Sequence, residues 1–315
     1  MIGRIAESLY WLGRYLERIE NHARLIDVDY HRQATHTERD QYPWKELIET
    51  LADVRAFQEQ KLPYNESTVL STIIFDKDNT NSIRSCVTSA RGNMQAIRER
   101  LPSELWNAIN GFHIWLDKQT LDNLLVYPHT FFEQIKNQTA LFQGIVESTM
   151  LRGQEWHMLE IGKYFERAEN TLRILRVVYC ENGIELSFGD ALALLKSVSG
   201  YEAFRKCLSN KISTVTMLEF LMLSAVFPRS TRFSLCHLNE HLAKLSDSQG
   251  GISHSIKNVR KLIGKMHAQL NYMDPSEIVR NGVADFLDLE VRRCNTIGSE
   301  IGQMFSAKGV NVLTF

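Results

Sequence analysis

The chain has 315 residues, with 36 basic and 37 acidic side chains and a formal charge of −1. Its 17 glycines and 6 prolines make up about 7% of the chain, well under the usual share of roughly 12%, which leaves few positions for tight turns and favours long helices. The even charge excludes the basic surface of a nucleic-acid-binding protein. No apolar run reaches the roughly 18–20 residues of a transmembrane helix, so we expect neither nucleic acid nor membrane as a partner.

The first predicted element is an amphipathic helix that recurs later in the chain. Residues 13–26, GRYLERIENHARLI, are repeated without a gap as residues 162–175, GKYFERAENTLRIL. In both copies, apolar residues alternate at spacings of three and four, the period of a helix packed in a bundle. This apolar seam consists of Leu9, Leu12, Leu16, Ile19, Ala23, Ile26 and Tyr30 in the first copy and Met158, Ile161, Phe165, Ala168, Leu172, Leu175 and Tyr179 in the second.

Further helical patterns follow in chain order, and none of the chain alternates with the period of a strand. They cover residues 43–60, 82–100, 102–116, 121–152, 188–209, 213–227, 230–246, 251–272 and 275–307. A second, shorter repeat relates Ser82-Ile-Arg84 to Ser230-Thr-Arg232. Each serine is placed to cap the helix that follows it. We therefore predict an all-α fold, a multi-helix bundle built from two pseudo-repeated halves, residues 1–149 and 150–315, in one compact unit.

A charged stripe lies opposite the apolar seam on both copies of the repeated helix. It consists of Arg14, Glu17, Arg18, Asn21 and Arg24 in the first copy and Lys163, Glu166, Arg167, Asn170 and Arg173 in the second. A solvent-exposed face with ion pairs three or four residues apart is the ordinary interpretation. Large apolar residues at the ends of the stripe instead favour partial burial, and buried charges need partners. We then expect Glu17 and Glu166 to accept hydrogen bonds from Arg18 or Arg167 in a network that is either structural or lines a ligand site.

Two further groups are weaker candidates for a site. His237, Glu240 and His241 have the H-x-x-E-H spacing of a zinc helix. The strands that accompany such a helix are missing from the sequence pattern, so an ordinary helix surface is the competing interpretation. Arg84, Arg91 and Arg98 form a basic row spaced by heptads and could bind carboxylates or phosphates, although a solvated face has the same pattern.

Arg229 and Arg232 lie at a predicted helix N-terminus. A positive charge there opposes the helix dipole unless an anion compensates it, which points toward a binding role.

The five cysteines are far apart and never form a C-x-x-C pair, which argues against a disulfide framework or a cysteine zinc site. Together with an N-terminus that lacks a signal-peptide core, they predict a cytoplasmic protein.

The segment LYWLGRYLERIENHAR, residues 9–24, resembles the bacterial Alpha-E family, an all-helical domain named for its Glu-Arg motif. The resemblance extends over nearly the whole chain, through Ser82-Ile-Arg84, Ala90–Asn93, Leu105–Asn110, Glu166-Arg167 and Phe227–Ser230. It implies no established activity. It does imply a genetic setting, because members of the family are commonly encoded beside, or fused to, a circularly permuted ATP-grasp carboxylate–amine ligase, and often beside a transglutaminase-like cysteine peptidase.

These observations predict an accessory or binding helical protein of a bacterial peptide- or amide-bond-forming system, with the ligase and the peptidase as partners. The stripes would organise paired helices, whereas Arg91, Arg98 and Arg229 would face anions. An enzyme that uses Glu17 and Glu166 as acid/base or metal-binding carboxylates is the alternative. A plain homodimeric scaffold is a third interpretation, and the sequence assigns no cofactor.

Overall fold

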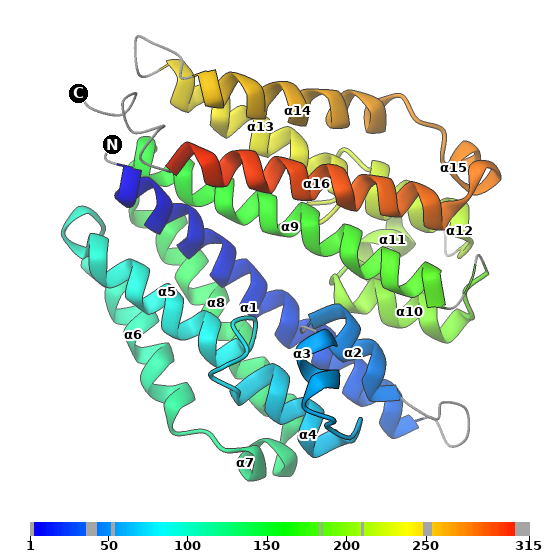
Figure 1. The fold of residues 1–315 in the computed structure, drawn as a ribbon, viewed down its shortest axis with the longest axis horizontal. Helices are drawn as coiled ribbons and strands as arrows, with labels where there is room; N and C mark the ends of the chain where they lie inside the picture. The colour runs from blue at the N-terminus through cyan, green and yellow to red at the C-terminus, as the bar shows by residue number, and fades with distance from the viewer. Residues whose placement is uncertain are drawn as a thin grey trace. The chain divides into compact units, whose positions relative to one another are not determined.

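A computed structural model describes residues 3–35, 43–51, 54–181, 183, 185–208, 211–247 and 254–305. Within these ranges every regular element is a helix, so the predicted all-α fold is confirmed. The first elements along the chain are α1 (Gly3–Thr35), α2 (Pro43–Leu51), α3 (Val54–Glu59), α4 (Glu66–Leu70), the π-helix η1 (Ser71–Phe75), α5 (Ile83–Ile97), the 3₁₀-helix η2 (Arg98–Arg100), α6 (Ser103–Asp117), α7 (Leu121–Val126) and α8 (Pro128–Thr149). They are followed by α9 (Gln154–Glu181), α10 (Phe188–Ser197), α11 (Tyr201–Leu208), α12 (Thr214–Leu218), the π-helix η3 (Glu219–Leu223), α13 (Thr231–Asp247), α14 (His254–Asn271), α15 (Pro275–Asn281) and α16 (Val283–Phe305) (Figure 1).

The chain divides into two compact units, and the division falls within α1. Unit 1 consists of Met1–Arg14 and Leu151–Phe315, and unit 2 consists of Tyr15–Met150. The first fourteen residues therefore belong with the C-terminal part of the chain.

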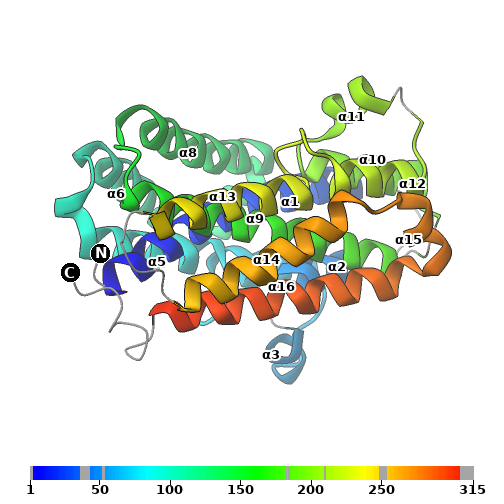
Figure 2. The same cartoon turned by 90° about the horizontal axis from the view of Figure 1, so that it is seen from above.

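Four long helices form the centre of unit 1. α9 packs against α13 and α16, and α14 packs against the same two helices, so the four run side by side (Figures 1 and 2). Every predicted seam residue of α9 is buried. In unit 2, α6 packs against α5 and α8, and α4 and η1 contact α2 and α5, respectively. The seam of α1 is buried from Leu9 to Ile26, while Tyr30 is half-buried.

Several helices that the sequence predicts as continuous are interrupted. Residues 121–152 divide into α7 and α8 because Tyr127 precedes Pro128, and a proline disfavours the helical conformation in the residue before it. Residues 275–307 divide at Gly282, which has a φ of 105°, a conformation that suits glycine. Residues 188–209 divide between Ser197 and Tyr201, where Ser199 has a φ of 51°.

Other predicted boundaries also differ from the structure. Residues 43–60 contain two helices, α2 and α3, and the helix predicted over 213–227 ends at Leu223. Residues 66–75, which the sequence analysis left unassigned, form α4 and η1. The predicted helix start at Gly251 and the predicted helix end at Ala307 both lie outside the described residues.

One stretch of unit 2 has the same order of elements as one stretch of unit 1. Asn65 caps α4, a five-residue helix that continues into the five-residue π-helix η1. Ser213 caps α12, which is equally short and continues into the five-residue π-helix η3.

The two stretches also begin their next long helix with the same serine contacts. The hydroxyl of Ser82 accepts a hydrogen bond from a backbone N–H of α5 and donates to the carbonyl of Asp76 at 2.6 Å. Ser230 accepts from a backbone N–H of α13 and donates to the carbonyl of Ser224 at 2.6 Å. The predicted capping by both serines is confirmed, while the repeat of two complete halves stays a prediction.

Candidate functional site

The predicted stripe of charge is part of a close helix crossing in unit 1. α1 meets α9 at Gly13 and Gly162, where each glycine faces the backbone of the other helix. A methyl group on Gly13 would overlap the carbonyl of Leu159, and one on Gly162 would overlap the carbonyl of Tyr10. The two helices approach this closely because both positions lack a side chain.

Arg14 binds two carboxylates on α9 at this crossing. Its Nε donates to Glu166 Oε2 at 2.6 Å, and its Nη2 donates to Glu169 Oε2 at 2.5 Å. The guanidinium can bridge both acids because its N–H groups have a fixed fork geometry. Arg14 is thus a donor to Glu166, while the predicted hydrogen bonds from Arg18 or Arg167 stay a prediction.

Aromatic rings lie beside the guanidinium group of Arg14. The guanidinium carbon of Arg14 lies 5.0 Å from the ring centre of Trp11 and 4.8 Å from that of Phe165. Burial raises the pKa of Tyr10, so its hydroxyl stays protonated and accepts from Arg14 at 3.4 Å. Burial alone would lower the pKa of Arg14, but the charges of Glu166 and Glu169 raise it overall, which keeps the guanidinium charged.

The first copy of the motif continues into unit 2. Glu17 is fully buried and Asn21 is 3% exposed, whereas Arg18 is half-buried. Arg18 donates to Asn81 Oδ1 at 2.7 Å, and its guanidinium carbon lies 5.8 Å from the ring centre of Tyr15. The structure thus buries the carboxylate of the motif and directs its arginine toward the loop before α5.

The second copy of the motif makes its contacts within unit 1. Lys163 is buried and forms an ion pair with Glu160 on its own helix. Arg167 and Asn170 are half-buried, and Arg167 donates to the carbonyl of Pro228 at 3.4 Å. The hydroxyl of Thr171 donates to the carbonyl of Arg229 at 2.8 Å, so α9 holds the turn before α13.

The basic residues predicted to face anions are divided between the units. In unit 2, Arg91 and Arg98 lie against the ring of Trp106, with guanidinium carbons 5.3 and 5.5 Å from its centre. Arg91 is also held by Asn110 Oδ1, at 2.8 Å from its Nε. In unit 1, Arg229 is half-buried in the turn before α13. The structure therefore groups Arg91 with Arg98 and does not place Arg229 in the same unit.

The H-x-x-E-H residues make separate contacts on α13. His237 Nδ1 lies 3.0 Å from Glu240 Oε2, whereas His241 Nδ1 lies 2.9 Å from His157 Nδ1 on α9. The ring of Tyr164 stacks on both His237 and His241. Burial, together with the nearby charge of His157, lowers the pKa of His241 to about 3. In the described part of the chain, the three side chains whose ligand atoms lie close enough together to bind one metal ion do not include His237, Glu240 or His241.

That group consists of Asp27, His31 and His129, which the sequence analysis did not single out. All three lie in unit 2, with Asp27 and His31 one turn apart on α1 and His129 at the start of α8. Lys136 of α8 donates to Asp27 Oδ2 at 2.7 Å. The spacing of Asp27 and His31 on one helix face was a readable signal, but the contribution of α8 depends on the tertiary fold.

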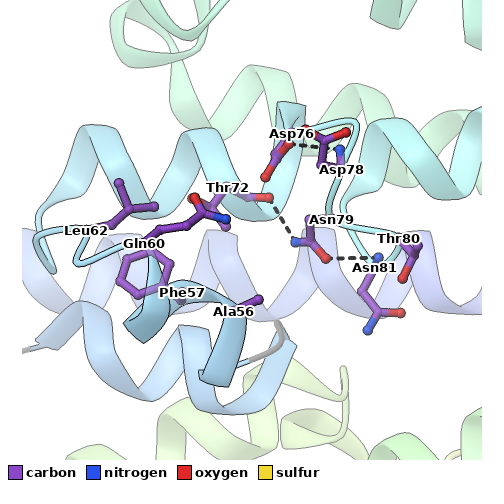
Figure 3. Close-up of a pocket in the computed structure, with 10 residues that line it drawn as sticks. All are labelled: Ala56, Phe57, Gln60, Leu62, Thr72, Asp76, Asp78, Asn79, Thr80 and Asn81. Atoms are coloured by element: carbon purple, nitrogen blue, oxygen red, sulfur yellow. Dashed lines mark hydrogen bonds between the residues drawn. The ribbon is translucent and has the colours of Figure 1, made fainter.

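A cavity of about 350 Å³ opens in unit 2 beside the loop before α5 (Figure 3). Figure 3 shows Phe57 on one side and the amide of Asn79 on the other, between Thr72 and Asn81. Asn79 donates to the carbonyl of Thr72 at 2.9 Å and accepts from the N–H of Asn81 at 3.0 Å. The loop thus satisfies its own amide, and neither Glu17 nor Glu166 lines this cavity.

The carboxylate of Glu166 is buried and paired with a cation. It accepts a hydrogen bond from Arg14 Nε, and the same guanidinium lies over the rings of Trp11 and Phe165. No described helix is both long and apolar enough to cross a membrane.

The comparisons with known proteins agree with the all-helical fold. The profile of the Alpha-E family, described as a predicted alpha-helical domain with a conserved ER motif, matches residues 1–305. Uncharacterized protein Rv2567 of Mycobacterium tuberculosis (strain ATCC 25618 / H37Rv) is 23% identical over 303 residues, which cover 87% of this chain and 33% of the relative. Uncharacterized protein Mb2597 of Mycobacterium bovis (strain ATCC BAA-935 / AF2122/97) is 22% identical with the same coverage.

The chain spans about a third of the length of these curated relatives. No solved structure matches it significantly. Because the family profile covers nearly all of its residues, the chain belongs to the Alpha-E family.

Proposed function

We propose that the chain is an accessory, binding helical module of a bacterial peptide- or amide-bond-forming system that works with an ATP-grasp ligase. The observation that carries this proposal is the closed Arg14–Glu166–Glu169 network. The glutamate of the second Glu-Arg motif is bound to Arg14 among aromatic rings, so the motif holds helices together. A non-catalytic role of the motif suits a module that acts by binding.

The length of the relatives also supports a module that acts with other parts. The matched region covers a third of each curated relative, so in those proteins the Alpha-E region is joined to a longer polypeptide. A module of this kind would act through a surface that contacts the other part of the system.

The surface around Trp106 in unit 2 is the one that we assign to binding. Two guanidinium groups, those of Arg91 and Arg98, lie against one indole ring, and Asn110 fixes the first of them. Guanidinium groups bind carboxylates in a bidentate manner, and an arginine stacked on an aromatic ring is already oriented. This surface suits an acidic segment of the ligase or a substrate that carries a carboxylate.

The test is an association experiment with a purified circularly permuted ATP-grasp ligase from the same organism, the class of enzyme beside which members of the family are commonly encoded. We expect the two proteins to co-elute in gel filtration, and we expect the double variant Arg91→Ala/Arg98→Ala to weaken the association at least tenfold. Arg292→Ala, which removes an exposed positive charge from α16 in unit 1, is the control and should bind like the wild type. If the two proteins do not associate, the proposal is overturned. If the double variant binds as tightly as the control, the assignment of the surface around Trp106 is overturned.

A further inference from the structure

The cluster of Asp27, His31 and His129 shares no residue with the Arg14 network or with the surface around Trp106. Three atoms meet there: Asp27 Oδ1, His31 Nε2 and His129 Nδ1. Their separations are 3.1 Å between Asp27 and His129, 3.4 Å between the two histidines, and 3.5 Å between Asp27 and His31. They form a nearly equilateral triangle in which each corner is an atom able to bind a metal.

The size of this triangle is that of one face of a zinc tetrahedron. Zinc lies about 2.0–2.1 Å from imidazole nitrogen and carboxylate oxygen. Two ligands at that distance and at the tetrahedral angle are about 3.3 Å apart. All three observed separations lie close to this value, so one ion above the triangle would reach the three atoms without a large movement of the side chains.

The carboxylate is oriented for this task. Asp27 is buried, and its Oδ2 accepts a hydrogen bond from Lys136 at 2.7 Å. This contact uses the oxygen that is turned away from the histidines and leaves Oδ1 for the cluster. A ligand carboxylate whose second oxygen is hydrogen-bonded is the usual arrangement in metal sites, because the outer contact fixes the direction of the inner one.

The histidines leave the site open to solvent. The side chains of His31 and His129 are each 59% exposed. Three protein ligands with access for water correspond to the open type of zinc site, whose fourth position holds water or substrate. Two imidazoles and one carboxylate favour zinc and neighbouring transition metals over Mg²⁺ and Ca²⁺, which prefer oxygen ligands alone.

We infer that Asp27, His31 and His129 form a binding site for one divalent transition-metal ion of the zinc type, with an open coordination position. The inference is independent of the proposed function, since it uses residues that lie neither in the Arg14 network nor beside Trp106. It adds to the chain a site at which an anionic or carbonyl group could bind an ion directly.

The experiment uses the full chain after treatment with EDTA and gel filtration. Zn²⁺ is titrated by isothermal calorimetry, and Co²⁺ is added to a second sample and followed by visible absorption. We expect one Zn²⁺ per chain, with no competition from excess Mg²⁺. We also expect a Co²⁺ spectrum of nitrogen and oxygen ligation without thiolate charge-transfer bands, because the three ligands include no cysteine.

Single variants identify the ligands. His31→Ala and His129→Ala should each weaken Zn²⁺ binding at least about tenfold and abolish the Co²⁺ bands. Because both side chains are largely exposed, the metal-free variants should unfold at the same temperature as the wild type. Asp27→Asn should weaken binding as well, and its thermal midpoint is measured in parallel because Asp27 is buried and paired with Lys136.

His113→Ala is the matched control. His113 and Asp117 form a histidine–aspartate pair one turn apart on α6, with 3.9 Å between His113 Nδ1 and Asp117 Oδ2. They do not belong to the three-residue cluster. This variant should bind Zn²⁺ like the wild type. The proposal is overturned if the wild type binds no Zn²⁺, or if His31→Ala and His129→Ala bind it as tightly as His113→Ala does.

Discussion

Each residue from Leu12 to Glu20 in the first copy of the repeated helix has a counterpart from Ile161 to Glu169 in the second. Along these nine positions the two helices have buried and half-buried residues in the same order. The charges, however, are used differently. Arg14 binds Glu166 and Glu169 on another helix, whereas its counterpart Lys163 forms an ion pair with Glu160 on its own helix.

The difference shows how one register position can have two structural roles. A guanidinium group presents several N–H donors in a plane and can bind two acids that lie apart, while an ammonium group is a compact charge. The identical burial follows from the shared apolar pattern. The choice of arginine or lysine then decides whether the position joins two helices or neutralises an acid on one.

The largest expected effect on stability comes from the close approach of α1 and α9 at Gly13 and Gly162. Gly13→Ala or Gly162→Ala should destabilise the protein by about 5 kcal/mol, because each methyl group would overlap a backbone carbonyl that cannot rotate away. Unfolding in urea measures the loss. Gly92→Ala on α5, where an added methyl group meets nothing within 4 Å, should be neutral or stabilise by about 0.5–1 kcal/mol. Equal behaviour of the three variants would contradict the crossing at Gly13 and Gly162.

Arg14 is the residue that most clearly separates the two copies. Arg14→Ala should cost about 3–4 kcal/mol, because Glu166 would stay buried without the guanidinium that binds it. Arg14→Lys retains the charge but not the fork, so it should still lose about 1.5–3 kcal/mol. Chemical denaturation of the two variants beside the wild type measures both losses. A lysine variant as stable as the wild type would show that charge alone explains the network.

Ser82 and Ser230 occupy corresponding positions outside the repeated helix, and they test whether corresponding contacts contribute equally to stability. Ser82→Ala and Ser230→Ala each remove a helix cap and a 2.6 Å bond to a carbonyl, and each should cost about 1–2 kcal/mol. Thermal unfolding of the two variants measures the comparison. If only one of the two variants loses stability, the two serines do not contribute equally despite their similar hydrogen bonds.

The smallest expected effect concerns the surroundings of Tyr164, the tyrosine of the second copy. Burial lowers the pKa of its neighbour His241 from about 6.5 to about 3. Between these values the unfolded chain binds a proton that the folded chain does not, so stability falls as the pH is lowered below 6.5. The loss for this group is roughly 1 kcal/mol between pH 6.5 and 5.5.

His241→Phe should reduce that loss while it retains the aromatic contact with Tyr164. Urea unfolding of the wild type and of the variant at both pH values measures the difference. Burial also lowers the pKa of His157, so part of the pH dependence should persist in the variant. Identical pH dependence of the two proteins would mean that His241 is not held neutral in the folded state.

The features that depend on neighbours in sequence were predictable. The apolar seam follows from the spacing of residues such as Leu12 and Leu16, and the caps follow from serines such as Ser82. The break at Pro128 had a readable signal, because the residue before a proline rarely stays helical. The same holds for Gly282, where an Asn-Gly pair marks a turn.

The contacts that join distant segments were not predictable in the same way. The pairing of Arg14 with Glu166 depends on how α1 and α9 are aligned, and two local patterns do not define that alignment. The cluster of Asp27, His31 and His129 likewise depends on the tertiary fold, since His129 lies on a helix about 100 residues after Asp27. Sequence periodicity thus predicts which side chains are buried, while the partner of each buried charge depends on tertiary structure.

The allocation of residues 1–14 to unit 1 has a consequence for biosynthesis. Arg14 meets Glu166 across 152 residues of sequence, and the whole of unit 2 is synthesised before the partner helix exists. The start of α1 must therefore wait for α9 to emerge from the ribosome, which makes unit 1 a late, high-contact-order step of folding. A fragment that begins at residue 151 lacks this segment. A synthetic peptide of residues 1–35 added in trans should therefore restore its stability.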